Sequence, residues 1–293
     1  MLVALLLSLA LQAATPETPP PTEIFLASLE RSTDGIGVGG SLNITNNPGY
    51  DNQPFFLPDG SILFTSNRGG KQTDVYQYSP ASRAVTRLTA TAESEYSPTQ
   101  TPDGSSVSVI RVEADGTQRL WRFPLEGGEP ALVLADVKPV GYHAWADPDT
   151  LVLFVLGDPP TLRIAHVRTG RADVLAERPG RCIARMRDGR VSFVQKGAAK
   201  DPWTIVALDP RTRAMTPIVE TLPGSEDYAW LPDGRLLMGS GSKLFVWNPT
   251  SAAAGWKEVA DLAPVLRKIT RLAVSADAAR LAITAEPVVT ARP

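Results

Sequence analysis

A three-residue turn signal recurs six times along this chain at nearly constant spacing, and this repeat constrains the fold more than any other feature. In its full form it is Pro-Asp-Gly, in which proline fixes φ and glycine accepts the left-handed conformation that a hairpin turn needs. Successive aspartates are 44, 46, 39, 45 and 44 residues apart. A period of about 40 to 45 residues is typical of β-propeller blades. The six copies are Pro58-Asp59-Gly60, Pro102-Asp103-Gly104, Pro148-Asp149-Thr150, Arg187-Asp188-Gly189, Pro232-Asp233-Gly234 and Ala276-Asp277-Ala278.

Each unit carries short apolar strands around its turn. In the first unit, the pattern predicts strands at residues 53–57, 61–66, 74–78 and 84–88. Four strands per unit make one propeller blade. Later units repeat the pattern at residues 107–112, 119–123, 131–134, 151–156, 162–167, 191–194, 203–208, 236–238 and 243–247.

The two ends of the chain carry complementary half-units. Residues 271–274 and 280–284 supply two strands of the last unit, and residues 23–29 and 41–45 match the missing third and fourth strands. The predicted fold is therefore an all-β six-bladed β-propeller with four-stranded antiparallel blades, closed by pairing of N- and C-terminal strands in the last blade. A β-sandwich or two unrelated all-β domains would require neither the repeated turn nor complementary ends.

The first fourteen residues differ from the rest of the chain. They contain no charged side chain and end in two alanines, which is typical of a signal peptide. The run is shorter than the about 20 apolar residues that span a bilayer, although the lack of Lys or Arg near Met1 leaves an uncleaved anchor open. Residues 15–22 contain four prolines and predict an extended leader, so the propeller is assigned to residues 23–293. We expect a periplasmic or secreted protein without stable membrane insertion.

Charge and cysteine content exclude several classes of protein. The 29 Lys and Arg residues nearly balance 31 Asp and Glu residues, giving a net charge of −2, so no global field draws the protein to nucleic acid. We expect a monomer with no nucleic-acid partner. The single cysteine, Cys182, excludes an intramolecular disulfide and a cysteine-based zinc cluster. The fold must therefore be stabilised by packing.

The first repeat resembles a known family. Residues 50–70 (YDNQPFFLPDGSILFTSNRGG), followed by Asp74-Val75-Tyr76, resemble the repeat of TolB-like, WD40-like (PD40) six-bladed β-propellers. The resemblance is clear at residues 95–104, weaker in later units, and covers residues 23–293. It implies a periplasmic or exported propeller used mainly for protein contacts. The separate N-terminal domain of the family's namesake is not expected here, because about eight residues separate the predicted signal from the first strand.

Candidate binding residues lie just before the inner strands. Loops that enter the innermost strands of a propeller gather around its axial channel. We predict that residues there bind a protein or peptide partner at the loop face. Asp51, Glu95 and Asp227 could instead hold a hard cation, but a polar rim of balanced charges is favoured, so neither metal nor cofactor is expected. Counting back from each turn selects Asp51, Asn52, Glu95, Tyr96, Tyr142, His143, Arg181, Asp227, Tyr228 and Arg271.

The alternative function is a hydrolase or lyase with a carboxylate- or metal-assisted site at the same axial mouth. Only two histidines, His143 and His166, are present, too few for a multi-histidine metal site. A Ser-His-Asp triad would need His143, but no Gly-x-Ser-x-Gly elbow presents a serine. No catalytic residue is assigned, and noncatalytic binding is favoured. Cys182 is expected to pack as a small apolar residue, and Arg68 to pair with a carboxylate of the same or a neighbouring blade.

Overall fold

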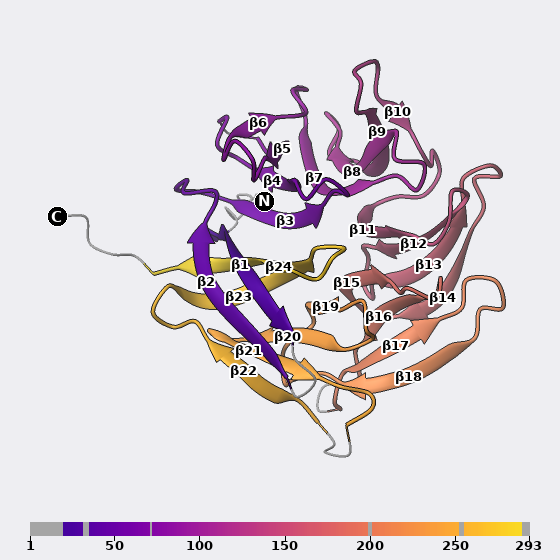
Figure 1. Cartoon of the computed structure of the whole chain (residues 1–293). Coiled ribbons are helices and arrows are strands. Elements are labelled where there is room, and N and C mark those ends of the chain that lie inside the picture. Colours follow the sequence, from indigo (N-terminus) through magenta and orange to yellow (C-terminus); the bar gives the residue numbers. More distant parts are fainter. Residues whose placement is uncertain (1–19, 32–34, 71, 199–200, 252–254, 289–293) are drawn as a thin grey trace, which may run out of the picture.

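The computed structural model describes residues 20–31, 35–70, 72–198, 201–251 and 255–288. These residues form 24 β-strands arranged as six four-stranded antiparallel sheets around a central axis (Figure 1). The fold is a six-bladed β-propeller, as the sequence predicts. The described part of the chain contains no helix that could cross a membrane. The predicted signal at residues 1–14 lies outside the described residues.

Five blades are continuous in sequence, and each runs from its inner to its outer strand. Blade 1 contains β3 (Asp51–Phe56), β4 (Ile62–Ser66), β5 (Asp74–Tyr78) and β6 (Val85–Arg87). Blade 2 contains β7 (Ser94–Gln100), β8 (Ser106–Val112), β9 (Gln118–Pro124) and β10 (Ala131–Leu132). Blade 3 contains β11 (Val140–Trp145), β12 (Thr150–Val155), β13 (Thr161–His166) and β14 (Ala172–Glu177). Blade 4 contains β15 (Pro179–Arg185), β16 (Val191–Gln195), β17 (Thr204–Leu208) and β18 (Met215–Glu220). Blade 5 contains β19 (Tyr228–Trp230), β20 (Leu236–Ser240), β21 (Lys243–Trp247) and β22 (Lys257–Asp261).

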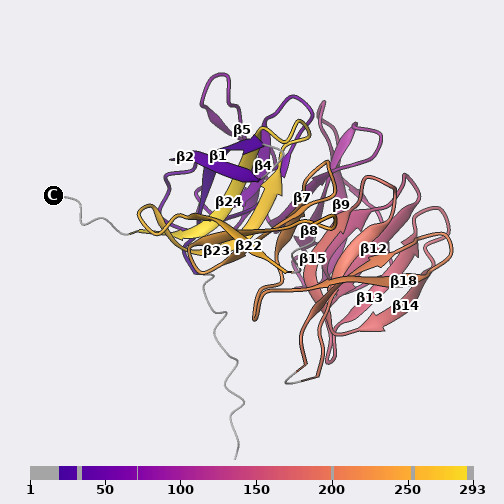
Figure 2. The same ribbon diagram turned by 60° about the horizontal axis from the view of Figure 1, so that its bottom comes forward.

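Blade 6 joins the two ends of the chain. Its inner strands are β23 (Leu266–Val274) and β24 (Arg280–Pro287), and its outer strands are β1 (Glu23–Arg31) and β2 (Ile36–Asn43). Phe25 of β1 lies opposite Ile283 of β24 in antiparallel register, and Figures 1 and 2 both show β1 beside β24. The predicted closure is confirmed. The outermost strand begins earlier than the predicted residues 41–45, because pairing with β1 continues through the glycine-rich residues 36–40.

All six turn signals connect the inner strand of a blade to its second strand. In the first, Gly60 has φ of 82° and the Asp59 carboxylate accepts a hydrogen bond from the backbone N–H of Ser61 at 2.9 Å. In the sixth, Ala278 occupies the glycine position with φ of 53°. The degraded copy therefore keeps the left-handed backbone conformation although it lacks glycine.

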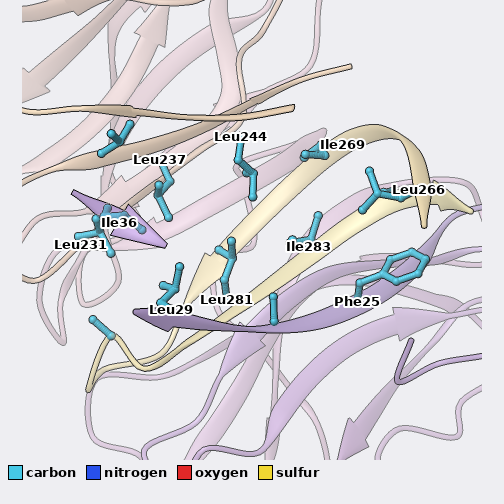
Figure 3. Packing of buried hydrophobic residues seen from close by; sticks show 14 residues of the cluster. Phe25, Leu29, Ile36, Leu231, Leu237, Leu244, Leu266, Ile269, Leu281 and Ile283 are labelled. Carbon is cyan, nitrogen blue, oxygen red and sulfur yellow. The ribbon is translucent and has the colours of Figure 1, made fainter. Parts of the chain in front are cut away.

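The hydrophobic core is divided into six clusters, one between each pair of adjacent blades. Strand alternation explains this division, because Leu151 and Leu153 of β12 face blade 2 while Val152 faces blade 4. Figure 3 shows the cluster between blades 5 and 6, where side chains from β1, β24 and β20 meet. Because every blade is packed on both sides, the inner strands are held in fixed positions. Six tryptophans pack in these clusters between blades: Trp121, Trp145, Trp203, Trp230, Trp247 and Trp256.

Candidate functional site

The inner strands of the six blades surround an axial channel of about 440 Å³. Small and apolar residues such as Pro54, Pro98, Ala144 and Ala184 line part of it. The turn signals lie at one end of the inner strands. The residues that precede or begin these strands lie at the other end, which we call the mouth.

Six side chains, one from each blade, meet at the mouth. Blades 1 to 3 each contribute a tyrosine, and blades 4 to 6 contribute two arginines with an aspartate between them. The first and fifth residues directly precede β3 and β19, and the other four belong to inner strands. We call this set the mouth ring: Tyr50, Tyr96, Tyr142, Arg181, Asp227 and Arg271.

Asp227 holds the charged half of the ring together. Its Oδ2 accepts hydrogen bonds from Nε and Nη2 of Arg181 at 3.1 and 2.5 Å. Its Oδ1 accepts a hydrogen bond from Nη1 of Arg271 at 3.3 Å. Outside the ring, Glu226 pairs with Arg181 at 3.5 Å and with Lys196 at 2.8 Å. Two ring arginines therefore share one ring carboxylate, which leaves the ring with net positive charge.

The tyrosine half of the ring presents three phenol groups. The rings of Tyr50 and Tyr96 meet edge to face with centroids 6.4 Å apart, and Arg271 lies over the ring of Tyr142 at 4.9 Å. Burial raises the pKa of Tyr50, so its hydroxyl keeps its proton. None of the three hydroxyls has a hydrogen-bond partner among the residues that the structure describes. They are donors and acceptors open to a ligand.

Asp51 lies behind the ring rather than on it. Its side chain is fully buried and pairs with Nη2 of Arg68 at 3.2 Å, and this guanidinium lies over the ring of Tyr76 at 5.3 Å. The pairing predicted for Arg68 is confirmed. Asn52 is also buried, and its Nδ2 donates to Oγ1 of Thr22 at 3.3 Å. The expectation that Asp51 and Asn52 belong to a polar rim is wrong, because both side chains are buried and bonded to neighbouring segments.

Glu95 occupies the equivalent position in blade 2. It is fully buried and accepts hydrogen bonds from the hydroxyls of Thr89, at 2.9 Å, and Thr91. Nε of Arg111 lies 4.0 Å from its carboxylate. Burial raises the pKa of Glu95 despite these hydrogen bonds. Since neighbouring strand residues face opposite ways, Tyr96 enters the mouth ring while Glu95 points away from it.

His143 is buried between blades 2 and 3. Its Nε2 lies 2.7 Å from Oγ of Ser108, which donates to the carbonyl of Thr99 at 3.0 Å and accepts from the indole N–H of Trp145 at 2.9 Å. A hydroxyl has one proton, so His143 must donate from Nε2. Burial lowers the pKa of His143 to about 3, which keeps the imidazole neutral. Ser108 is fully buried and already donates its proton, so this pair is not an exposed nucleophile and base.

Tyr228 makes the matching contact between blades 4 and 5. Its hydroxyl and the indole N–H of Trp230 both lie 2.8 Å from Oγ of Ser192. Cys182 donates to the carbonyl of Tyr228 at 3.4 Å, and burial raises the pKa of its thiol to about 12. Cys182 therefore packs as a protonated thiol, as expected. The hydroxyl of Tyr228, like the imidazole of His143, joins blades and does not belong to the mouth ring.

The three carboxylates that were candidates for a cation do not converge. Asp51 is held by Arg68 of its own blade, Glu95 is held by threonines of the segment that connects blade 1 to blade 2, and Asp227 lies between two arginines. Across the described residues, no three His, Cys, Asp or Glu side chains form a group that could hold a metal ion.

Tyr50 is the ring residue that counting back from the turns missed. It lies eight residues before its turn signal, whereas the ring residues of blades 2 to 4 lie six residues before theirs and those of blades 5 and 6 lie five. The bulge between Asn52 and Phe55 does not explain this difference, because β7 has the same bulge between Tyr96 and Thr99. Tyr50 instead lies one residue before β3, where its carbonyl accepts a hydrogen bond from the backbone N–H of Asn67 at 3.1 Å. The available signal was the tyrosine directly before Asp51.

No protein-family model and no curated protein matches this sequence. Several solved structures match its fold. The protein assigned as TolB from Agrobacterium tumefaciens is 14% identical with a TM-score of 0.69, covering 90% of this chain and 98% of that one. TolB from Acinetobacter baumannii is 14% identical with a TM-score of 0.57, covering 90% and 64%. Oligogalacturonate lyase from Vibrio parahaemolyticus is 12% identical with a TM-score of 0.60, covering 84% and 80%. At these identities the likeness establishes the fold, which is a TolB-like β-propeller.

Proposed function

We propose that this chain is an exported, noncatalytic β-propeller that binds an acidic segment of a protein partner at the mouth ring. The observation that supports the proposal is the composition of that ring. Three phenol hydroxyls without partners among the described residues face two arginines that share one aspartate. Arginine and tyrosine are also the residue types that contribute most at protein interfaces.

The chemistry of the ring favours a carboxylate ligand. Guanidinium groups bind carboxylates through charge-assisted hydrogen bonds, and phenol hydroxyls add donors of fixed direction. Asp227 orients Arg181 and Arg271 without neutralising both. The packed inner strands hold the ring in place, so binding requires little reorganisation of the protein.

A hydrolase or lyase is the competing function, and the similarity in fold to oligogalacturonate lyase supports it. The residues around the mouth favour binding instead, because Ser108 and His143 are buried and the carboxylates are already paired. Assays with ester, glycoside, phosphate and uronate polymer substrates test this. Turnover that a His143→Leu variant lacks would contradict the noncatalytic proposal.

Titration with short peptides tests the binding proposal. The probes are capped nonapeptides in a glycine–serine background that carry two aspartates, two lysines or neither, and calorimetry measures affinity. We expect the aspartate peptide to bind best. Arg271→Gln should weaken binding of this peptide at least about tenfold, since a hydrogen bond to a charged group contributes about 1.5–3 kcal/mol.

Two further variants complete this test. Tyr142→Phe removes one ring hydroxyl and should weaken binding severalfold while the melting temperature is unchanged. Arg122→Gln alters an exposed arginine of β9 outside the ring and should have no effect. Equal affinity of wild type, Arg271→Gln and Tyr142→Phe for the aspartate peptide would overturn the proposal.

Export is proposed from the sequence of residues 1–14, with cleavage close to Ala13 or Ala14. Mass spectrometry of the fractionated native protein tests it. Recovery of the intact chain from the cytoplasm would contradict export.

A further inference from the structure

A groove of about 520 Å³ adjoins the mouth ring and lies between blades 3 and 4. It shares Tyr142 and Arg181 with the axial channel. Its lining continues outward through Phe154 of β12 and Pro160 before β13, and Trp203 before β17 forms part of the other side. A chain bound at the mouth ring could therefore extend into this groove without leaving the protein surface.

Apolar side chains line the groove. Leu156 is 39% exposed, one of few large apolar side chains at the surface of the described residues, and it lies in this lining. The groove walls are held in place on both sides. Phe154 contacts Tyr142 edge to face at 5.6 Å, and Nζ of Lys196 lies 4.5 Å over the ring of Trp203. Full burial of one leucine or phenylalanine side chain contributes about 1.5–3 kcal/mol.

One arginine in the groove is not committed to a carboxylate. Glu226 pairs with both Arg181 and Lys196, but the exposed Arg178 has no ion pair or side-chain hydrogen bond among the described residues. The backbone of Arg178 is fixed, since its N–H donates to the carbonyl of Pro160 at 2.8 Å and its carbonyl accepts from Lys196 at 3.1 Å. The groove thus combines an apolar surface with an unpaired positive charge.

We infer that this groove binds the apolar residue of an extended partner segment in which acidic residues lie on both sides of one leucine or phenylalanine. The apolar side chain packs against Leu156, Phe154 and Trp203. One acidic residue faces the mouth ring, and the other faces Arg178. Positive charge at both ends of an apolar groove selects this pattern over a basic or purely apolar segment. The inference rests on the proposed function and adds the sequence pattern of the partner.

The test uses the full signal-free protein and capped nonapeptides in which two aspartates flank a leucine or a serine. We expect the leucine peptide to bind wild type at least about tenfold more tightly than the serine peptide. Leu156→Ser should remove most of this difference. The matched control is Val174→Ser on β14, which is 55% exposed and lies outside the groove, and it should keep the difference.

Charge reversal tests the contact with Arg178. Arg178→Glu should weaken binding of the leucine peptide severalfold. Replacing the peptide aspartate that faces Arg178 by lysine should restore binding to this variant but not improve binding to wild type. Arg122→Glu, on blade 2, is the control. If binding depends on Arg271 but not on the leucine, Leu156 or Arg178, the groove inference is wrong and the mouth proposal stands. If wild type binds none of the peptides, both are wrong.

Discussion

Asp51 and Glu95 on one side of the propeller and Asp227 on the other all lie near the start of an inner strand, yet their surroundings differ. The first two are fully buried: Arg68 of the same blade holds Asp51, and two threonine hydroxyls of the segment between blades 1 and 2 hold Glu95. Asp227 is 12% exposed and lies between arginines of the two neighbouring blades. Asp51 and Glu95 each lie one residue away from a mouth-ring position, and they stabilise buried parts of the fold. Asp227 occupies a mouth-ring position, and it orients the binding surface.

This difference divides the mouth into two regions with separate tasks. Blades 1 to 3 use Asp51, Glu95 and His143 in buried contacts and present only phenol groups at the ring. Blades 4 to 6 present the charges. Substitutions of the buried polar residues of blades 1 to 3 should change stability more than binding, whereas substitutions of mouth-ring residues should do the reverse.

The largest effect is expected for Asp51→Ala. The change leaves Arg68, whose side chain is 19% exposed, without its carboxylate. Removing one partner of such a buried pair costs about 3–5 kcal/mol of unfolding free energy. Urea denaturation measures this, and Asp51→Ala/Arg68→Ala should recover part of the loss. A loss below about 1 kcal/mol would contradict the structural role assigned to Asp51.

His143→Leu should change the response to acid. The pKa of His143 is lowered by burial from 6.5 to about 3, so its contribution is present above pH 6.5 and is lost as pH falls toward 3. The unfolded chain takes up the proton first, at roughly 1.4 kcal/mol per pH unit. The leucine variant lacks this titration. Across pH 6.5, 5.5 and 4.5 the unfolding free energy of wild type should therefore fall relative to that of the variant, and parallel curves would show that His143 is not buried.

Glu95→Gln should give a smaller pH effect of opposite sign. Burial raises the pKa of Glu95 above 4.5, so the folded state holds its proton more tightly than the unfolded state does. Its stabilising contribution is complete at low pH and is lost as pH rises from 4.5 through the folded pKa. Relative to the glutamine variant, wild type should lose stability over that range. If wild type instead gains stability relative to the variant as pH rises, the folded state favours the ionised form of Glu95, and the conclusion that burial dominates at this position is wrong.

The fold was predictable because its signals are local and repeated. The turn signals fix where each inner strand ends, and the half-units at the two ends of the chain predict the closure of blade 6. Even the degraded turn at Ala278 keeps its place and backbone conformation. The outer strand β2 was less predictable, since glycine, which is depleted in strands, occupies three of its first five positions.

The site was only partly predictable, because the direction in which a side chain points depends on its exact position along the inner strand. Counting from the turns places residues within about two positions, but successive strand residues face opposite ways. The same count of six residues reaches ring residues such as Tyr142 and Arg181 but selects buried Asn52 in blade 1, because the ring residue Tyr50 lies before the strand there. The partners of Asp51 and Glu95 lie in other segments of the chain. The sequence around each inner strand therefore does not reveal that these carboxylates are buried and bonded.

The smallest change in stability is expected for Asp227→Asn, which most sharply separates the two regions. The amide keeps the shape of the side chain and an acceptor for Arg181, so unfolding free energy should fall by less than it does for Asp51→Ala, which removes the acceptor altogether. The ring changes from one net positive charge to two. The acidic peptide should therefore bind severalfold more tightly, and the gain should shrink with added salt because exposed charges are screened. Weaker binding to the variant would mean that the Asp227 carboxylate itself contacts the ligand. The ring would then recognise a donor group rather than an acid, and the division between structural and binding carboxylates would remain while the chemistry assigned to the partner would change.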